Sequence, residues 1–160
     1  MTVEKYMNSV LRTWRTDLPA EDRLLNIKGS LFEECGELAG IMKKYIFHGH
    51  DLDIEEIKKE LGDIMFYLFA FFHEYQYTIE EIKGEFMIGF KHKRSGEDIK
   101  KLYEMLTTYV GRQMINLIII FSIIYSLDLK LSDVLQTNID KLQARYPDGF
   151  SEQASRERVE

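Results

Sequence analysis

The strongest constraint on this fold is that proline occurs at only two of 160 positions, Pro19 and Pro147. Proline breaks helices in their interiors, so its rarity leaves long stretches free to be helical. In those stretches apolar residues recur with the spacing of helices that bury one face. No segment shows the sustained alternation of apolar and polar residues that is typical of a half-buried strand. The sequence therefore predicts an all-α fold, a helical bundle of about five to seven helices.

Proline, glycine and capping residues bound the expected helices. Asp53 with Glu56, and Thr78 with Glu81, have the capping-box spacing of two helix starts. The expected helices cover about 3–17, 20–47, 53–75, 78–95, 97–110, 112–127 and 132–146. We expect a single domain over 1–150 and a polar C-terminal tail over 151–160 that frays.

Two stretches of the sequence, 64–82 and 115–134, share one pattern. In each, an apolar helix is followed by a short turn and then by the start of an amphipathic helix. A duplicated helical hairpin would give this pattern, and so would two unrelated amphipathic hairpins.

Charge and composition exclude several classes of partner. The formal net charge of −6 disfavours nucleic acid, because general nucleic-acid binders neutralise phosphates with cations. The longest apolar run, 115–127, has 13 residues, which is too short to span a bilayer, so no membrane partner is expected. A single cysteine, Cys35, forbids an internal disulfide, and the first residues contain no signal-peptide core. We expect a cytoplasmic protein.

Acidic residues gather at two places that a helical hairpin would bring face to face. Glu34 and Glu37 lie three residues apart in one expected helix, and Glu60 and Asp63 lie three apart in the next. Side chains with this spacing are neighbours on one helix face. Four carboxylates at short range repel one another unless cations lie between them, and oxygen ligands in such numbers suit Mg²⁺ or Mn²⁺.

Helix geometry selects the same four acids. At about 100° per residue, they border the apolar stripes of their helices, whereas Glu33 points away. A solvated charged face would give clustered acids as well, and this alternative stays open on residue pattern alone.

The pattern Glu33-Glu34-x-x-Glu37, then 22 residues, then Glu60-x-x-Asp63, resembles the MazG-like all-α nucleoside triphosphate pyrophosphohydrolases. Further similar segments, in the family's order, are 11–14, Asn26, 43–50, 138–142 and 145–150. The resemblance implies an enzyme that cleaves a nucleoside triphosphate between its α and β phosphates, giving a nucleoside monophosphate and pyrophosphate. It also implies that Glu34, Glu37, Glu60 and Asp63 are the catalytic residues and hold Mg²⁺, for which Mn²⁺ can substitute.

Five further residues are candidates for substrate binding, each beside a simpler structural role. Lys44, Lys141 and Arg145 could contact phosphate oxygens, or they could be exposed cations at helix ends. Asn138 could bind sugar or phosphate, or cap a helix, and Tyr67 could contact the nucleotide or pack in the core.

The chain departs from the family pattern in one interval. Asp63 and Asn138 are 75 positions apart, whereas in compact members about one helix and a turn separate these motifs. We therefore expect a helical insertion within 78–125, which puts the placement of Asn138, Lys141 and Arg145 in doubt.

Two alternatives to a general nucleotide pyrophosphohydrolase remain open. The same scaffold could have dUTPase-like or phosphoribosyl-ATP pyrophosphohydrolase-like specificity, or the chain could be a non-catalytic helical interaction protein. We also expect a homodimer or homotetramer, because the helix over 112–127 is apolar almost all round and must be covered on most sides.

Overall fold

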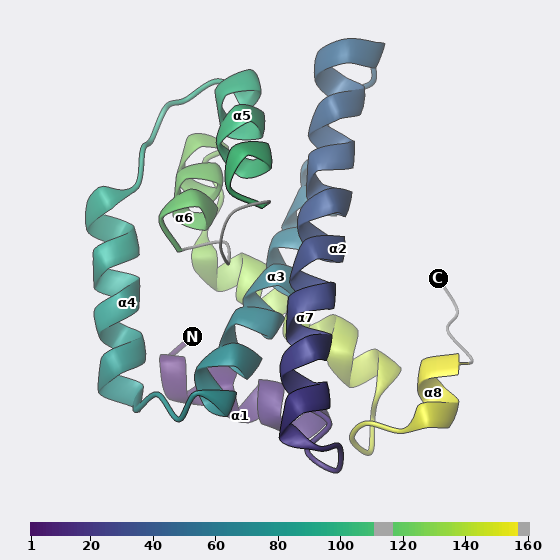
Figure 1. The fold of residues 1–160 in the computed structure, drawn as a ribbon. Helices are drawn as coiled ribbons and strands as arrows, with labels where there is room; N and C mark the ends of the chain where they lie inside the picture. Colours follow the sequence, from purple (N-terminus) through teal and green to yellow (C-terminus); the bar gives the residue numbers. More distant parts are fainter. Residues whose placement is uncertain (111–116, 157–160) are drawn as a thin grey trace.

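The computed structural model describes residues 1–110 and 117–156, which form eight α-helices and no strand (Figure 1). The predicted all-α fold class is therefore confirmed. The helices are α1 (Val3–Thr13), α2 (Ala20–His48), α3 (Ile54–Glu74), α4 (Ile79–His92), α5 (Ile99–Val110), α6 (Leu117–Ser126), α7 (Leu131–Arg145) and α8 (Glu152–Arg156). Among the described helices, none combines the length and apolar character needed to cross a membrane.

The capping signatures mark helix starts as predicted. The Asp53 carboxylate accepts a hydrogen bond from the Glu56 backbone N–H at 3.0 Å, which starts α3. Thr78 and Glu81 form a reciprocal capping box at the start of α4. Helix α4 ends at His92, earlier than predicted, and residues 152–156 of the polar tail form α8. Residues 112–116 of the sixth expected helix, and 157–160, lie outside the described residues.

The first helix is shorter than predicted, because a tertiary contact ends it at Thr13. Trp14 adopts an extended backbone conformation, and its indole N–H donates a 2.7 Å hydrogen bond to the Glu74 carboxylate. Arg23 binds the same carboxylate at 2.8 Å. The segment before α2 is thus held against the end of α3.

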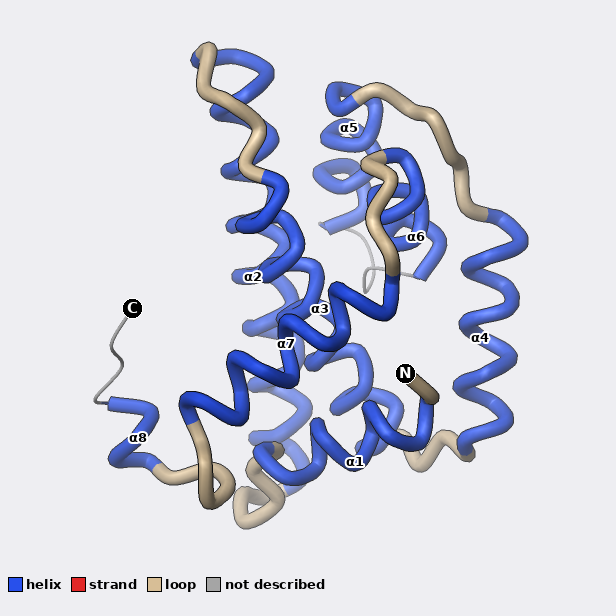
Figure 2. Tube along the Cα trace, turned by 180° about the vertical axis from the view of Figure 1, so that it is seen from behind, coloured by secondary structure: helices blue, strands red, loops and turns tan. Residues whose placement is uncertain are grey.

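The centre of the molecule is the antiparallel hairpin of α2 and α3 (Figure 1). Nine of the twelve residues from 61 to 72 of α3 are buried, because α2, α7 and α1 pack around this helix. Seen from behind, α7 crosses over α3 (Figure 2). Gly62 permits this crossing, since a Cβ atom there would lie 2.9 Å from the Cβ atom of Asn138. The close approach brings the Asn138 side chain to the acidic part of α3.

Helices α4, α5 and α6 complete the bundle. Helix α4 packs on α6, and α5 packs on both α2 and α6. Seven of the ten residues of α6, Leu117 and 119–124, are buried inside the chain. This apolar helix therefore needs no second chain to cover it, contrary to the expectation from its sequence, because α4 and α5 pack on it. The oligomeric state itself stays a prediction.

Candidate active site

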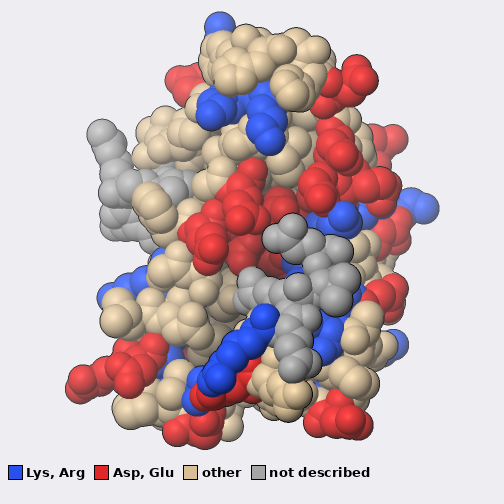
Figure 3. All heavy atoms as spheres, turned by 90° about the vertical axis from the view of Figure 1, so that its right-hand side faces the viewer, with Lys and Arg blue, Asp and Glu red and all other residues tan. Residues whose placement is uncertain are grey.

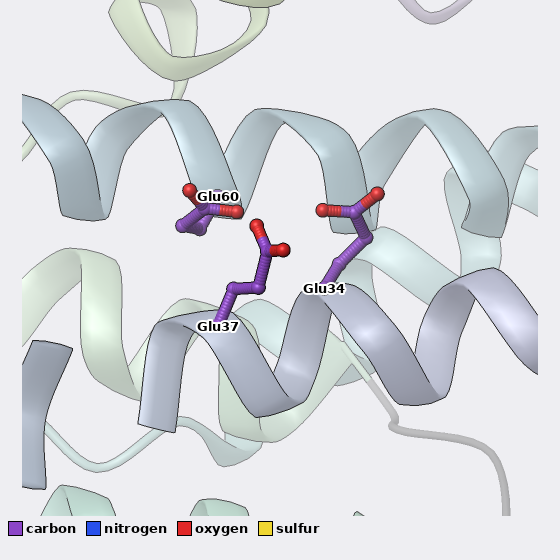
Figure 4. A group of neighbouring side chains, drawn as sticks. All are labelled: Glu34, Glu37 and Glu60. Carbon is purple, nitrogen blue, oxygen red and sulfur yellow. The ribbon is translucent and has the colours of Figure 1, made fainter. Parts of the chain in front are cut away.

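Three of the four predicted acids converge across the α2–α3 hairpin. Glu34 and Glu37 extend from α2 toward α3, and Glu60 extends from α3 to meet them (Figure 4). One carboxylate oxygen from each lies within 4.8 Å of the other two. The i, i+3 spacing on α2 and the antiparallel packing of α3 produce this geometry. Oxygen ligands that converge in this way can hold a hard divalent cation.

The fourth acid, Asp63, has different partners. Its Oδ1 atom accepts a 2.8 Å hydrogen bond from Nδ2 of Asn138, and its Oδ2 atom forms an ion pair with Lys141. Both partners come from α7, so the insertion expected within 78–125 does not separate the C-terminal motif from the acids. Asp63 is thus anchored to α7 instead of lying within the group of three.

Burial and mutual repulsion disfavour full ionisation of the acidic group. Burial, and then the neighbouring carboxylates, raise the pKa of Glu34 to about 8. The same two causes, in the same order, raise the pKa of Glu60 to about 7, while Lys141 opposes them. These acids must therefore hold protons or a cation at neutral pH.

One atom of the cluster fits a bound cation directly. The Oε2 atom of Glu60 is buried and has no hydrogen-bond donor among the described residues. A buried carboxylate oxygen without a partner carries a large desolvation cost. A divalent cation between the two helices would satisfy it, and the donor set of carboxylate oxygens fits Mg²⁺ or Mn²⁺.

The acids form one wall of a cleft of about 470 Å³. Figure 3 shows Asp and Glu side chains gathered at the middle of the α2 side of the molecule, with Lys and Arg side chains above and below them. Lys141 and Arg145 of α7 line the same cleft, Lys141 in direct contact with Asp63. The cleft therefore offers groups for a cation and for an anion side by side. Its aromatic lining consists of Trp14, Phe66, Tyr67, Tyr146 and Phe150.

Seven of the nine predicted site residues line this cleft, and two do not. Asn138 is buried beneath it, 1% exposed, and is in place to hold Asp63, not to contact a ligand directly. Tyr67 lies in its wall, half-buried, and Glu33 lies exposed at its edge. Lys44 is exposed on α2 and is not part of the cleft lining. It lies seven residues beyond Glu37, which is about 10 Å along a helix.

Sequence reasoning missed one buried partner of the site, Tyr6. This side chain of α1 is fully buried, and its hydroxyl donates a 2.8 Å hydrogen bond to Oδ1 of Asn138. No local signal identifies it, because a tyrosine on an amphipathic helix reads as a core residue. Tyr146 and Phe150 were also missed, although they flank Pro147 in the segment that resembles the family's C-terminal motif.

Residues 23–93 match the family model of the MazG nucleotide pyrophosphohydrolase domain. The match covers most of α2 and all of α3 and α4, and it contains all four acids. Helix α7, with Asn138 and Lys141, lies outside it. No curated protein and no solved structure matches the chain. With the all-helical fold, the family match identifies residues 23–93 as a MazG-like domain.

Proposed function

We propose that this chain is a Mg²⁺-dependent nucleoside triphosphate pyrophosphohydrolase. It hydrolyses the anhydride bond between the α and β phosphates, consuming one water and releasing a nucleoside monophosphate and pyrophosphate. The observation that carries the proposal is the group of three carboxylates on the α2–α3 hairpin, within the residues that match the MazG model. Among the described residues, this is the group of three side chains whose possible metal-ligand atoms all lie within 4.8 Å of one another.

Glu34, Glu37 and Glu60 are the residues that would hold the cation. When bound, Mg²⁺ or Mn²⁺ supplies charge neutralisation of the triphosphate and lowers the pKa of a bound water. The chain's acids alone repel a triphosphate, so the cation requirement follows from their charge. The unpartnered Oε2 atom of Glu60 supports the same reading.

The cations of α7 bind the phosphates. Lys141 is held by its ion pair with Asp63, which leaves its remaining ammonium hydrogens for phosphate oxygens. The Arg145 guanidinium offers a planar fork that suits two phosphate oxygens at once. Asp63 therefore has two tasks in this proposal: it completes the acidic wall, and it positions Lys141.

The aromatic side chains of the cleft provide a surface for the base. Trp14 lies edge-to-face with both Phe66 and Tyr67, at centroid distances of 6.2 and 6.5 Å. An aromatic wall beside a charged one matches the two ends of a nucleotide. A volume of about 470 Å³ is in the range of small-ligand sites, roughly 300–1,000 Å³.

Two further parts of the proposal concern the protein's state. We place it in the cytoplasm, since its one cysteine is buried and free, as expected in a reducing compartment. We also propose that it is a homodimer or homotetramer.

Pyrophosphate release from the common NTPs and dNTPs, from dUTP and from phosphoribosyl-ATP tests this function. The assay is run with Mg²⁺, with Mn²⁺ and with EDTA, and both products are identified. We expect pyrophosphate and nucleoside monophosphate with either metal, and none with EDTA. Release of inorganic phosphate and a nucleoside diphosphate would show cleavage between the β and γ phosphates and would contradict the proposal. Preference for dUTP or phosphoribosyl-ATP would narrow the specificity, and no release from any nucleotide would favour a non-catalytic interaction protein.

A further inference from the structure

The outer side of α4 carries large apolar side chains that the chain leaves exposed. Met87 is 72% exposed, Phe90 53% and Ile88 50%. Together with Tyr125 of α6 they border a hollow of about 700 Å³, whose lining is apolar apart from Lys91 and the tyrosine hydroxyl. Figures 1 and 2 place α4 at the edge of the molecule away from α2, so this face is separate from the acidic cleft. Exposed apolar patches of this kind mark surfaces that bind a partner.

Gly84 lies in the middle of the same face, and no packing contact in the described part of the chain requires a glycine there. A glycine inside a helix destabilises it relative to alanine. Gly89, on the opposite side of α4, is required, because a Cβ atom there would lie 2.8 Å from Leu117 of α6. A Cβ atom on Gly84 would meet nothing within 4 Å. A small residue at this position suits the close approach of a second helix from outside.

Charge is distributed along the face in a way that specifies the partner. On a helix, Glu80, Gly84, Met87, Ile88 and Lys91 share one side, at the spacing i, i+4, i+7, i+8 and i+11. The acid lies at the N-terminal end, the lysine at the C-terminal end, and the apolar residues between them. The Glu80 side chain is 83% exposed, and its Oε1 atom pairs with Lys83 of the same helix at 2.9 Å, so the second oxygen is the one that faces a partner. Lys91 is exposed as well.

An antiparallel copy of this helix is complementary to it at four of these five positions. A two-fold axis between residues 85 and 86 places each Glu80 opposite the Lys91 of the other copy. The same axis places Gly84 opposite Met87, so that the largest exposed side chain meets the open position. In a parallel arrangement Glu80 would face Glu80, and Lys91 would face Lys91, which is repulsive at both ends.

We propose that a second copy of this chain docks on the α4 face, with the two α4 helices antiparallel about a two-fold axis near Gly84 and Met87. The contact is isologous, so each copy supplies both the acid and the lysine. The apolar side chains supply most of the affinity, and the two charge pairs at the ends select the antiparallel orientation. The proposal does not depend on the proposed function, since it concerns a different face.

The mass of the full chain in solution tests the docking surface. By sedimentation equilibrium at micromolar concentration, we expect the parent to self-associate and Met87→Glu to lose the α4 contact. A matched control is Phe32→Glu on the outer side of α2, where Phe32 is 66% exposed. That variant should keep the α4 contact. Circular dichroism and the melting temperature of both variants should stay close to those of the parent, because both positions are exposed.

A charge exchange tests the orientation. Glu80→Lys alone and Lys91→Glu alone each place like charges together at both ends of an antiparallel contact. Exposed ion pairs contribute little each, but both ends of the contact change together, so each single change should raise the Kd roughly tenfold. The double variant Glu80→Lys/Lys91→Glu restores opposite charges and should recover most of the affinity.

Three outcomes overturn the proposal. One is a monomeric parent, and another is a Met87→Glu variant whose mass equals that of the parent. The third is a double charge variant no tighter than either single change, which would contradict the antiparallel arrangement. None of these measurements uses catalysis, so an inactive protein would leave their meaning unchanged.

Discussion

Helices α3 and α6 are both apolar and deeply buried, yet their polar residues behave in opposite ways. In α6, Ser122 is fully buried and satisfied: it donates to the Ile118 carbonyl at 2.7 Å and accepts from the Arg94 N–H at 2.8 Å. In α3, Glu60 keeps a buried oxygen without a donor among the described residues. A buried polar group in a helical core can therefore stabilise the fold through its hydrogen bonds, or it can lack a partner and be available to a ligand. Ser122 is an example of the first kind and Glu60 of the second.

The largest effect should come from removing the acids of α3 and α2. Glu34→Ala, Glu37→Ala and Glu60→Ala should each lower kcat/KM for a good nucleotide by about a thousandfold, or about 4 kcal/mol of barrier, if the cation carries the charge stabilisation. Asp63→Ala should have an effect of similar size, because it removes one acid of the cleft wall and releases Lys141. Glu33→Ala is the matched control. Glu33 lies at the exposed edge of the cleft, so the kcat/KM of this variant should stay within roughly tenfold of that of the parent. This allowance covers a residue that orients a metal ligand without binding the metal itself. An inactive Glu33→Ala beside an active Glu34→Ala would shift the assigned site by one residue.

Metal addition should stabilise the protein through the same acids. Mg²⁺ should raise the melting temperature of the parent, because the cation binds the native state alone. At a Mg²⁺ concentration of a hundred times Kd, the free energy of unfolding should rise by about 2.7 kcal/mol. Glu37→Gln should lose this dependence, and without metal it should be at least as stable as the parent, because one repelling charge is gone. Glu33→Gln should keep the Mg²⁺ shift. Equal shifts in Glu37→Gln and the parent would argue against the site.

Removing the satisfied serine of α6 should change stability and leave catalysis intact. Ser122→Ala leaves the Arg94 N–H without its acceptor, which should cost about 1–3 kcal/mol in urea unfolding. Its kcat/KM should remain within twofold of the parent, because α6 does not line the cleft. Ser9→Ala, at an exposed hydrogen bond within α1, should change stability by less than about 0.5 kcal/mol. A strong loss of activity in Ser122→Ala would contradict the view that the buried polar group of α6 serves stability alone.

The parts of the site that local pattern determines could be predicted from sequence. The i, i+3 acid pairs and the hairpin turn suffice to bring Glu34, Glu37 and Glu60 together, because helix phase and a short connection fix their positions. The separation of Asp63 from this group could not be predicted, since it depends on α7 crossing α3 at Gly62. The early end of α1 was missed for a similar reason, because the contact between Trp14 and Glu74 spans 60 positions.

Helix α6 illustrates the opposite error. Its sequence is apolar almost all round and predicts that a second chain covers the helix, whereas α4 and α5 of the same chain pack on it. The exposed apolar residues lie instead on α4, whose sequence is amphipathic and unremarkable by pattern. Which of two apolar helices lies outside depends on how the elements pack, and single-helix periodicity does not contain that information.

The smallest effect should come from Tyr6, which acts on the site only through Asn138. An ionised Asp63 can only accept hydrogen bonds, so Asn138 must turn its amide nitrogen toward it and its oxygen toward the Tyr6 hydroxyl. Tyr6→Phe keeps the edge-to-face packing on Phe69, at 4.7 Å, and removes only the hydroxyl. The buried Asn138 oxygen then loses its donor, and the free energy of unfolding should fall by about 1–2 kcal/mol.

Kinetics separate this positioning role from a purely structural one. With Asn138 less restrained, the Asp63 carboxylate and its ion pair with Lys141 are less well fixed, so Tyr6→Phe should lower kcat several-fold at nearly constant KM. Tyr103→Phe is the matched control, because Tyr103 packs on Phe47 at the other end of α2 and lies outside the cleft lining. It should leave both kinetic constants unchanged. If Tyr6→Phe is less stable but retains the parent's kcat, the chain of hydrogen bonds from α1 through α7 to α3 holds the fold together and does not tune the site.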